Sequence, residues 1–339
     1  MILSFHRAIV LGSLMGLALS PVLLSACADS VAINTGAGGP GGDQDAPNVE
    51  IAHESCDLES SDAQKGDANG DGKGVEVHEM GNKSVTALQE AYVRKVIDTV
   101  NEFDNVLYEI SNENHPPSTP WQYHMIRFIK ACEKSKPHRH PVGMTFQYKG
   151  GSNKTLFDSP AEWISPNHEG GYRDDPPANN GGKVVLSDTD HLWGIGGNQA
   201  WVWKSFTRGL NPLFMDPYDG TVLGSRFDAK WDLIRRSLGY TLNYANRMDL
   251  KNTVPSNDLA SSRYCLANPG QEYLIYLPEG GEVIVDLTER EREFSVEWFD
   301  PSSGKAKKAK SVKGGAKRTF ESPFGKTDAV LFLSTENAG

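Results

Sequence analysis

Positive charge is in short supply in this chain of 339 residues: 34 Lys and Arg stand against 44 Asp and Glu, a formal net charge of −10. Because proteins bind nucleic-acid phosphates through a basic face, this balance argues against nucleic acid as a partner and leaves neutral polymers such as glycans open. Hydrophobic residues make up 38% and charged residues 23%, which is typical of a globular protein, and the length favours two domains.

Cysteine is also scarce, with four in the chain: Cys27, Cys56, Cys132 and Cys265. No pair has the CxxC spacing, and no cysteine and histidine stand at the spacing of a metal site. Cys132 falls on the apolar face of a predicted helix and Cys265 in a predicted strand, so both are interpreted as buried small hydrophobic residues. The protease motifs HExxH and GxSxG are missing, which disfavours a protease.

One segment, DANGDGKGVEVHE, resembles a calcium-binding loop. It places oxygen ligands at Asp67, Asn69 and Asp71 and a turn glycine at Gly72. The twelfth position of the loop, which needs a Glu, is His78, and flanking helices are not evident on both sides. A Gly/Asp-rich turn is therefore the alternative to a calcium site, and no other cofactor is predicted.

The N-terminus has the pattern of a targeting segment. His6 and Arg7 precede an apolar run, residues 8–24, whose length and flanks suit a signal peptide better than a membrane-spanning helix. The run ends Leu-Ser-Ala-Cys, which resembles a bacterial lipobox. We therefore expect residues 1–27 to be a lipoprotein signal peptide in which Cys27 is lipidated. An ordinary signal peptide with an incidental cysteine is the alternative.

Residues 28–47 are rich in glycine, a composition typical of a flexible linker. Together with the lipobox, this linker predicts a secreted protein that is anchored through lipid to the bacterial cell envelope, in the periplasm or at the cell surface. The lipid would be its only contact with a membrane.

Beyond the linker, apolar residues first alternate between helical and strand periodicity, which implies parallel βαβ units. Strands are predicted at 105–111, 141–148, 183–188 and 212–216, with helices at 85–102, from Pro120 after Ser118 or Thr119 as N-cap, at 198–209 and at 226–248. The first of these helices has an apolar row at helical spacing, made of Leu88, Tyr92, Val96, Val100 and Phe103.

The pattern changes near residue 262. No helix signal remains, and short strands separated by Gly, Pro and charged turns predict an antiparallel β-sandwich at 262–337. Its Lys-rich stretch, 305–318, is interpreted as a solvated hairpin.

Polar residues follow two of the apolar strands at the point where each strand ends. The first strand continues into Ser111, Asn112, Glu113, Asn114 and His115, and the strand at 183–188 continues into Asp188, Asp190 and His191. Carboxylates at the carboxyl ends of parallel strands are where an α/β barrel keeps its chemistry.

The Asn112-Glu113 pair resembles the Asn-Glu that ends the fourth strand of the retaining (β/α)8 glycoside hydrolases. More broadly, the segments YEISNENHPPS, GMTFQYKGGSN, WISPN, VVLSDTDHLWGIGGNQAWVWKSFTRG and LFMDPYDG resemble bacterial secreted proteins that join a glycoside-hydrolase-like barrel to a C-terminal β domain. The family name of that domain is "putative collagen-binding domain of a collagenase". No residue here favours collagen over another ligand.

The resemblance implies a (β/α)8 (TIM) barrel at 48–255, but only a partial one. Such a barrel takes about 250 residues. Only its strands four to eight, and at most strand three as well, can be placed in this sequence. The first two or three units look missing. We expect a truncated or fused gene product, or a sheet that is closed by another element or another subunit.

By the same resemblance, Glu113 is the acid/base of a glycoside hydrolase and Asp188 is its nucleophile or base, with Asp190 as the alternative. The usual residue at that second place is Glu, so Asp is a departure by one methylene. Retaining and inverting mechanisms, which differ in carboxyl spacing, both remain open.

Several nearby polar and aromatic side chains are suited to a sugar. The predicted substrate-binding residues are Asn112, His115, Gln147, Tyr148, His191, Trp193, Asp216 and Tyr218. The sequence thus favours a secreted glycoside-hydrolase-like protein acting on O-glycosidic bonds of a polysaccharide. The alternative is a catalytically inactive surface protein that binds carbohydrate or extracellular matrix.

Overall fold

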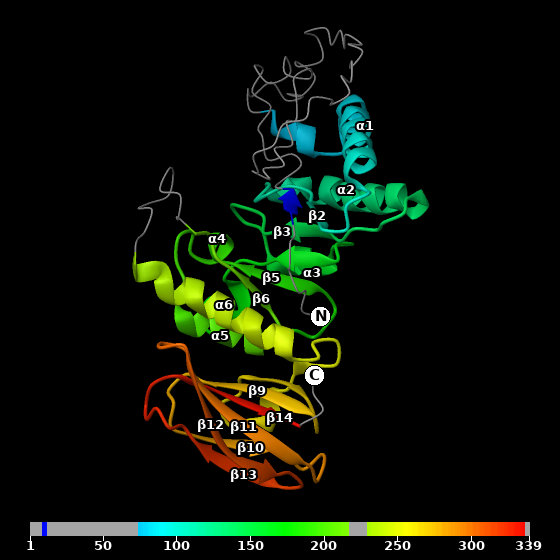
Figure 1. Cartoon of the computed structure of the whole chain (residues 1–339). Coiled ribbons are helices and arrows are strands. Elements are labelled where there is room, and N and C mark those ends of the chain that lie inside the picture. Colours follow the sequence, from blue (N-terminus) through cyan, green and yellow to red (C-terminus); the bar gives the residue numbers. More distant parts are fainter. Residues whose placement is uncertain (1–8, 12–73, 217–228, 336–339) are drawn as a thin grey trace, which may run out of the picture.

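The computed structural model describes residues 9–11, 74–216 and 229–335 (Figure 1). These residues form two stacked regions, a parallel sheet with helices and an antiparallel β region below it. The predicted lipidation site, the Gly-rich linker, the calcium-type ligands Asp67, Asn69 and Asp71, and Tyr218 lie outside the described residues. Within the described ranges, no helix has both the length and the apolar character needed to cross a membrane.

The parallel sheet has six strands in chain order, and every pairing between neighbours is parallel. This confirms the parallel strands predicted from the helical crossovers. Among the described residues no pairing joins the last strand to the first, so the sheet is a half-barrel. Its strands are β1 (Ile9–Leu11), β2 (Val106–Glu109), β3 (Val142–Thr145), β4 (Trp163–Ser165), β5 (Val184–Asp188) and β6 (Asn211–Leu213).

Strand β1 lies within the predicted signal peptide. It pairs in parallel with β2, so that Ile9–Leu11 stand opposite Val106, Leu107 and Tyr108. A short, apolar and partly β-branched segment suits the edge of a buried parallel sheet. The signal peptide itself stays a prediction.

The helices flank this sheet, and Asn side chains cap two of them. Asn82 Oδ1 accepts a bond from the Val85 N–H at 3.2 Å, and Asn198 Oδ1 accepts one from the Trp201 N–H at 2.8 Å. The helices are α1 (Lys83–Val100), α2 (Thr119–Cys132), α3 (Asn153–Asp158), α4 (Thr189–Leu192), α5 (Gln199–Thr207) and α6 (Asp232–Arg247). Short 3-10 turns lie at Val75–His78, Pro116–Ser118, Glu133–Ser135, Glu169–Gly171, Ala229–Trp231 and Asn257–Leu259.

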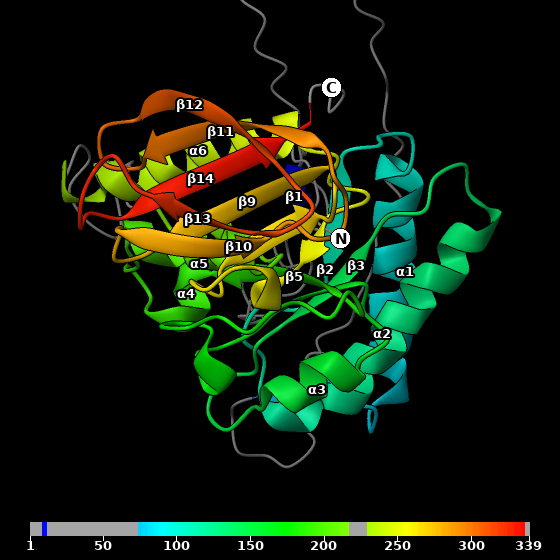
Figure 2. The ribbon, with the colours of Figure 1, turned by 90° about the horizontal axis from the view of Figure 1, so that it is seen from below.

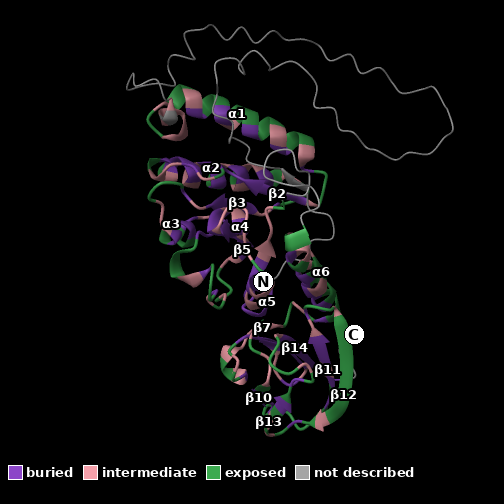
Figure 3. Cartoon of the chain, turned by 90° about the vertical axis from the view of Figure 1, so that its left-hand side faces the viewer, coloured by how far each residue is buried: buried purple, intermediate pink, exposed green. Residues whose placement is uncertain are grey.

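Helix α1 buries a different face from the predicted one. Its buried residues are Thr86, Gln89, Val93 and Ile97. The predicted apolar row is largely outside, with Leu88 and Tyr92 half exposed. The polar Gln89 can be buried because both ends of its amide are hydrogen-bonded: Nε2 donates to the Val77 carbonyl at 2.9 Å and Oε1 accepts from Trp121 Nε1 at 2.9 Å. Figure 3 shows the exposed side of α1 at the outer end of the half-barrel.

The C-terminal region consists of two antiparallel sheets. One has six strands in the order β12-β11-β14-β9-β8-β7, the other pairs β10 with β13, and buried apolar side chains fill the space between them. The strands are β7 (Val254–Pro255), β8 (Cys265–Asn268), β9 (Glu272–Leu277), β10 (Glu282–Asp286), β11 (Glu293–Asp300), β12 (Lys305–Lys313), β13 (Lys317–Glu321) and β14 (Ala329–Ser334).

The hairpin predicted for the Lys-rich stretch is wrong. Its two halves, β12 and β13, pair with β11 and β10 in different sheets, so the Gly314-Gly315 turn crosses from one sheet to the other. The solvation was predicted correctly, because nearly every residue of β12 is exposed (Figure 3). An edge strand rich in lysine is protected from pairing with another chain.

A second apolar layer joins the two regions. Helices α5 and α6 lie against the six-stranded antiparallel sheet of the C-terminal region (Figures 1 and 2). Trp203 of α5 stacks on Tyr276 of β9 with ring centroids 6.2 Å apart. At the rim, Glu297 of β11 accepts bonds from Tyr244 and Arg247 of α6. The buried members of this interface layer are Trp203, Phe206, Tyr244, Ala245, Met248, Tyr264, Leu266, Leu274, Tyr276, Phe299, Val330 and Phe332.

Candidate active site

A histidine connects the ends of β2 and β5. His191, in the short helix after β5, places Nε2 3.2 Å from Asn112 Oδ1, although the two residues are 79 positions apart in the chain. Its Nδ1 lies 2.7 Å from the Ser165 hydroxyl at the end of β4. Two predicted sugar-binding residues, Asn112 and His191, are therefore in direct contact, and both stand at the carboxyl edge of the parallel sheet.

Glu113 follows Asn112 in an unusual backbone conformation. Its φ of 47° lies in the left-handed region, which a non-glycine residue adopts at a cost, and its N–H lies 3.3 Å from Thr145 Oγ1 on β3. Burial raises the pKa of the Glu113 carboxyl; His191 opposes this, and the charges of Asp190 and Asp188 add to it. The structure thus brings the predicted acid into electrostatic contact with both predicted partners.

Asp188 ends β5 and caps the helix that follows. Its Oδ1 accepts a bond from the Asp190 N–H at 2.9 Å, which fixes the side chain at the N-terminus of α4. Burial raises the pKa of Asp188; the hydrogen bond from the Asp190 N–H and the nearby His191 oppose this, and the charge of Asp190 adds to it. Both aspartates are only partly exposed, so neither is an ordinary surface carboxylate.

A further carboxyl group lies deeper on the same face of β2. Glu109 is 9% exposed and lies 3.3 Å from the Thr145 hydroxyl. Burial, opposed by that hydrogen bond and reinforced by Asp188 and Asp190, raises the pKa of Glu109 to about 7. The sequence places it two residues before Ser111 on the face of Glu113, but gives no sign that it would be buried among acids.

Two predicted substrate-binding residues, Gln147 and His115, form hydrogen bonds within and around the loop after β2. Gln147 is 2% exposed, and its amide bonds Thr119 at 2.9 Å and the carbonyl of His115 at 3.3 Å. The His115 ring bonds Asn114 through Nδ1 at 2.8 Å and Glu79 through Nε2 at 3.3 Å. In this structure both side chains have protein partners and hold the loop in place.

The remaining predicted residues lie in three settings. Tyr148 is 54% exposed beside Lys149, whose Nζ is 5.3 Å from the ring centroid. Trp193 packs edge-on against Trp201 and under the guanidinium of Arg173, at 5.5 and 5.2 Å between centres. Asp216 is held by Arg235, Oδ1 accepting at 2.8 Å and Oδ2 at 2.9 Å.

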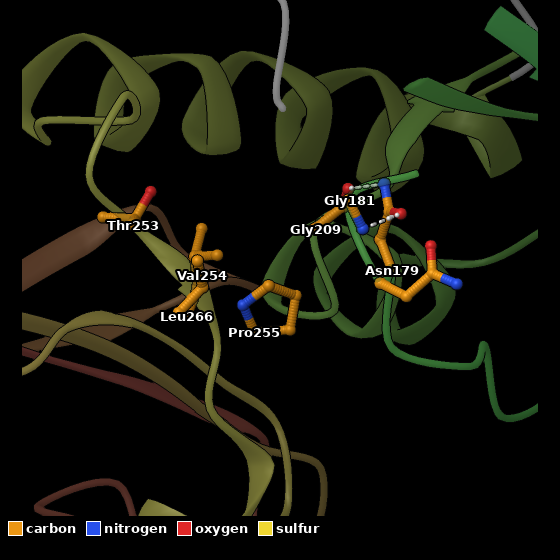
Figure 4. A pocket seen from close by; sticks show the side chains of 8 residues that line it. Asn179, Gly181, Gly209, Thr253, Val254, Pro255 and Leu266 are labelled. Carbon is orange, nitrogen blue, oxygen red and sulfur yellow. Dashed lines mark hydrogen bonds between the residues drawn. The ribbon is translucent and has the colours of Figure 1, made fainter. Parts of the chain in front are cut away.

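A cavity of about 280 Å³ lies elsewhere, where the half-barrel meets the C-terminal region (Figure 4). The Asn179 amide donates to the Lys183 and Gly209 carbonyls, and its Oδ1 accepts from the Gly181 N–H. The lining holds no titratable side chain and no predicted site residue, which argues against a catalytic role. The lining residues are Asn179, Asn180, Gly181, Gly209, Thr253, Val254, Pro255 and Leu266.

No group of three or more His, Cys, Asp or Glu side chains in the described ranges is arranged to hold a metal ion. The acids at the strand ends face a histidine, hydroxyl and amide groups. This set is suited to proton transfer and to hydrogen bonding of hydroxyl groups.

Comparison with known proteins gives two results. Residues 251–334 match the family described as "Putative collagen-binding domain of a collagenase", and nothing among the curated proteins matches the chain. Among solved structures, one described as "Glycoside hydrolase" has 13% identity and a TM-score of 0.54 over 75% of this chain and 70% of that one. A glycoside hydrolase family 5 protein from Bacteroides vulgatus ATCC 8482 has 14% identity and a TM-score of 0.56, over 74% and 66%.

The fold is glycoside-hydrolase-like. At these identities the likeness concerns the fold alone, and the chain spans about two thirds of each of the two structures. The family match covers the C-terminal antiparallel region, from the turn before β7 to the end of β14.

Proposed function

We propose that the protein is a glycoside hydrolase that acts on O-glycosidic bonds of a carbohydrate polymer, and that β2 to β6 correspond to strands four to eight of a (β/α)8 barrel. The observation that carries this is the contact between His191 and Asn112. It joins the ends of β2 and β5 and brings Glu113 within electrostatic reach of Asp188 and Asp190.

In this site Glu113 is the general acid. The glycosidic oxygen of a natural glycan is a poor leaving group unless it receives a proton, and a carboxyl group whose pKa is raised by burial is protonated more of the time near neutral pH. Asp188, at the end of β5, attacks the anomeric carbon or activates a water molecule, and Asp190 is the alternative. The Asn112 amide and the His191 ring bond the sugar hydroxyls.

The test measures hydrolysis of a panel of plant and microbial polysaccharides by the wild type and by Glu113→Gln, Asp188→Asn and Asp190→Asn. Loss of general-acid help should lower turnover by about 10²- to 10⁴-fold. Of the two aspartate variants, the one with the larger loss identifies the nucleophile or base. Glu102→Gln, a change at an exposed glutamate after α1, is the matched control and should leave turnover unchanged. Equal activity in all variants would refute the assignment.

A second function is favoured by the family match in the C-terminal region. If the half-barrel is inactive, the protein is a surface protein whose residues 251–334 bind carbohydrate or extracellular matrix. Binding of fluorescently labelled collagen and of insoluble polysaccharides to the whole protein separates the two. Binding without hydrolysis of any glycan supports this second function.

We also propose that the chain is exported and anchored by lipid at Cys27, in keeping with its lipobox-like sequence. Labelled palmitate should enter the protein in a bacterial host, and Cys27→Ser should abolish the labelling. Label that persists in this variant would show that the anchor is elsewhere.

A further inference from the structure

The Thr145 hydroxyl lies among three groups, one at the end of β2 and two in the turn that carries Asn112 and Glu113. Its oxygen is 3.3 Å from Glu109 Oε1, 3.1 Å from the Ser111 carbonyl oxygen and 3.3 Å from the Glu113 backbone nitrogen. A hydroxyl has one proton to donate and two lone pairs with which to accept. If Glu109 is ionised, its carboxylate and the Ser111 carbonyl both need a donor, and Thr145 can serve only one of them.

A neutral Glu109 removes this conflict. Its carboxylic acid donates to the Thr145 oxygen, Thr145 donates to the Ser111 carbonyl, and the Glu113 N–H fills the second lone pair of Thr145. All four groups then have a partner, as buried polar groups require. The turn that holds Glu113 at a φ of 47° is thereby tied to β3 by two hydrogen bonds.

The surroundings of Glu109 also favour the neutral form. The charged groups that act on it are Asp188 at the end of β5 and Asp190 in α4; both are acidic, and no Lys or Arg in the described part of the chain forms an ion pair with it. β3 contributes the uncharged Thr145. Burial is the largest cause of the raised pKa of Glu109, which is about 7.

We propose that Glu109 is a positioning residue: in its neutral form it directs the Thr145 proton to the Ser111 carbonyl, and so fixes the turn that presents Asn112 and Glu113. Its effect on turnover rests on the proposed function. Its effect on folding rests on its burial and its hydrogen bonds, and does not depend on the proposed function.

The two effects give a defined pH dependence. The pKa of Glu109 lies above its ordinary value of 4.5 in the folded protein, so the unfolded chain loses this proton first as the pH rises. The cost to folding begins above 4.5, grows until about 7 and is constant beyond. At high pH, ionised Glu109 also adds a negative charge beside Asp188 and Asp190.

The test compares the unfolding midpoint of the wild type with that of Glu109→Gln, which keeps the size and cannot ionise. The unfolding midpoint of the variant minus that of the wild type, measured at the same pH, should be higher at about pH 8.5 than at about pH 5, by on the order of 5 °C. Glu102→Gln should show no such rise. A Glu109→Gln difference that does not change with pH would overturn the proposal.

Thr145 provides a second pair of variants. Thr145→Val removes the hydroxyl at nearly the same size, and Thr145→Ser keeps it. On a hydrolysed glycan, Val should lower kcat by at least tenfold with little change in KM, and Ser should restore it; equal behaviour of Val and Ser would overturn the role of the hydroxyl. If the wild type hydrolyses no glycan, the proposed function fails, and the unfolding midpoints still decide the role of Glu109.

Discussion

The two regions of the molecule treat buried polar groups in opposite ways. In the half-barrel, acidic and imidazole side chains such as Glu109, Glu133, His140 and His191 are buried among the strands and helices. In the described C-terminal strands and turns, the buried polar residues are few, and the space between the sheets is filled by aliphatic and aromatic side chains. Buried polarity costs stability unless it is paired, so these side chains of the half-barrel depend on the hydrogen bonds that they form with one another and with the backbone.

The regions also differ in how their strands are completed. The half-barrel strands have three to five residues and form a sheet that does not close among the described residues. The C-terminal strands β9 to β14 have five to nine residues and alternate between buried and exposed positions in β10 and β11. We infer that the half-barrel depends on its α5 and α6 layer against the C-terminal sheet for much of its stability.

The largest expected effect tests this dependence. Trp203→Ala removes a fully buried ring from the layer between the regions, where it contacts Tyr244, Tyr276 and Phe299. The loss should be about 3–5 kcal/mol, measured by denaturant unfolding. Tryptophan fluorescence and circular dichroism should report one shared transition in the wild type. If the half-barrel unfolds at the same denaturant concentration in the variant, the two regions are independent.

The next effect tests buried polarity in the half-barrel. Glu133 accepts bonds from Asn101, Tyr108 and both the ring and the backbone N–H of His140, whose other ring nitrogen lies 2.6 Å from a carbonyl oxygen. Glu133→Ala leaves these donors unpaired and should cost about 3 kcal/mol. Glu102→Ala, at an exposed position, is the control. Equal stability of both variants would show that the hydrogen bonds of Glu133 contribute nothing to the free energy of unfolding.

A smaller effect of opposite sign is expected at the site. Because burial raises the pKa of Glu113, its ionised form is disfavoured in the folded state, and this cost appears as the pH rises above the ordinary value for a glutamate. Glu113→Gln should therefore be as stable as the wild type at low pH and slightly more stable at pH 8. Thermal unfolding at the two pH values measures this, and a variant that is less stable at pH 8 would contradict it.

The smallest effect on stability is expected at β12. Lys307 and Lys310 are exposed on the edge strand, so Lys307→Val with Lys310→Val should change the free energy of unfolding by less than about 0.5 kcal/mol. The same change removes the charges that guard the edge, and light scattering should show faster aggregation. The control is Lys154→Val on α3, an exposed lysine away from any sheet edge.

The comparison also shows what sequence could foresee. Strand periodicity located β2, β3, β5 and β6, and the polar residues that end β2 and β5 were correctly expected to lie at one edge, since parallel strands put their carboxyl ends together. In the C-terminal region, Gly and Pro turns marked most strands, but β12 was assigned to a hairpin within the Lys-rich stretch, whereas it is an edge strand that pairs with β11.

Side-chain partners were beyond reach. The Gln147 amide is a group that could bind a sugar hydroxyl. Only the fold shows that it is hydrogen-bonded to Thr119 and to the loop after β2. Helix α1 carries two rows of similar periodicity, and which row is buried depends on the helices that surround it. The environment of Glu109 depends on Thr145 of the adjacent strand β3 and on Asp188 and Asp190 at and after the end of β5, which are far from Glu109 in the sequence.

The central claim is that the ends of β2 and β5 form one site in which Glu113 gives a proton to the leaving group. The most direct measurement is the ratio of wild-type to Glu113→Gln turnover on two substrates of the same sugar, a natural glycan and an aryl glycoside with a good leaving group. The account predicts a large loss on the glycan, about 10²-fold or more, and a much smaller loss on the aryl glycoside, which needs little protonation. Equal losses on both substrates, or full turnover of the glycan by Glu113→Gln, would contradict it.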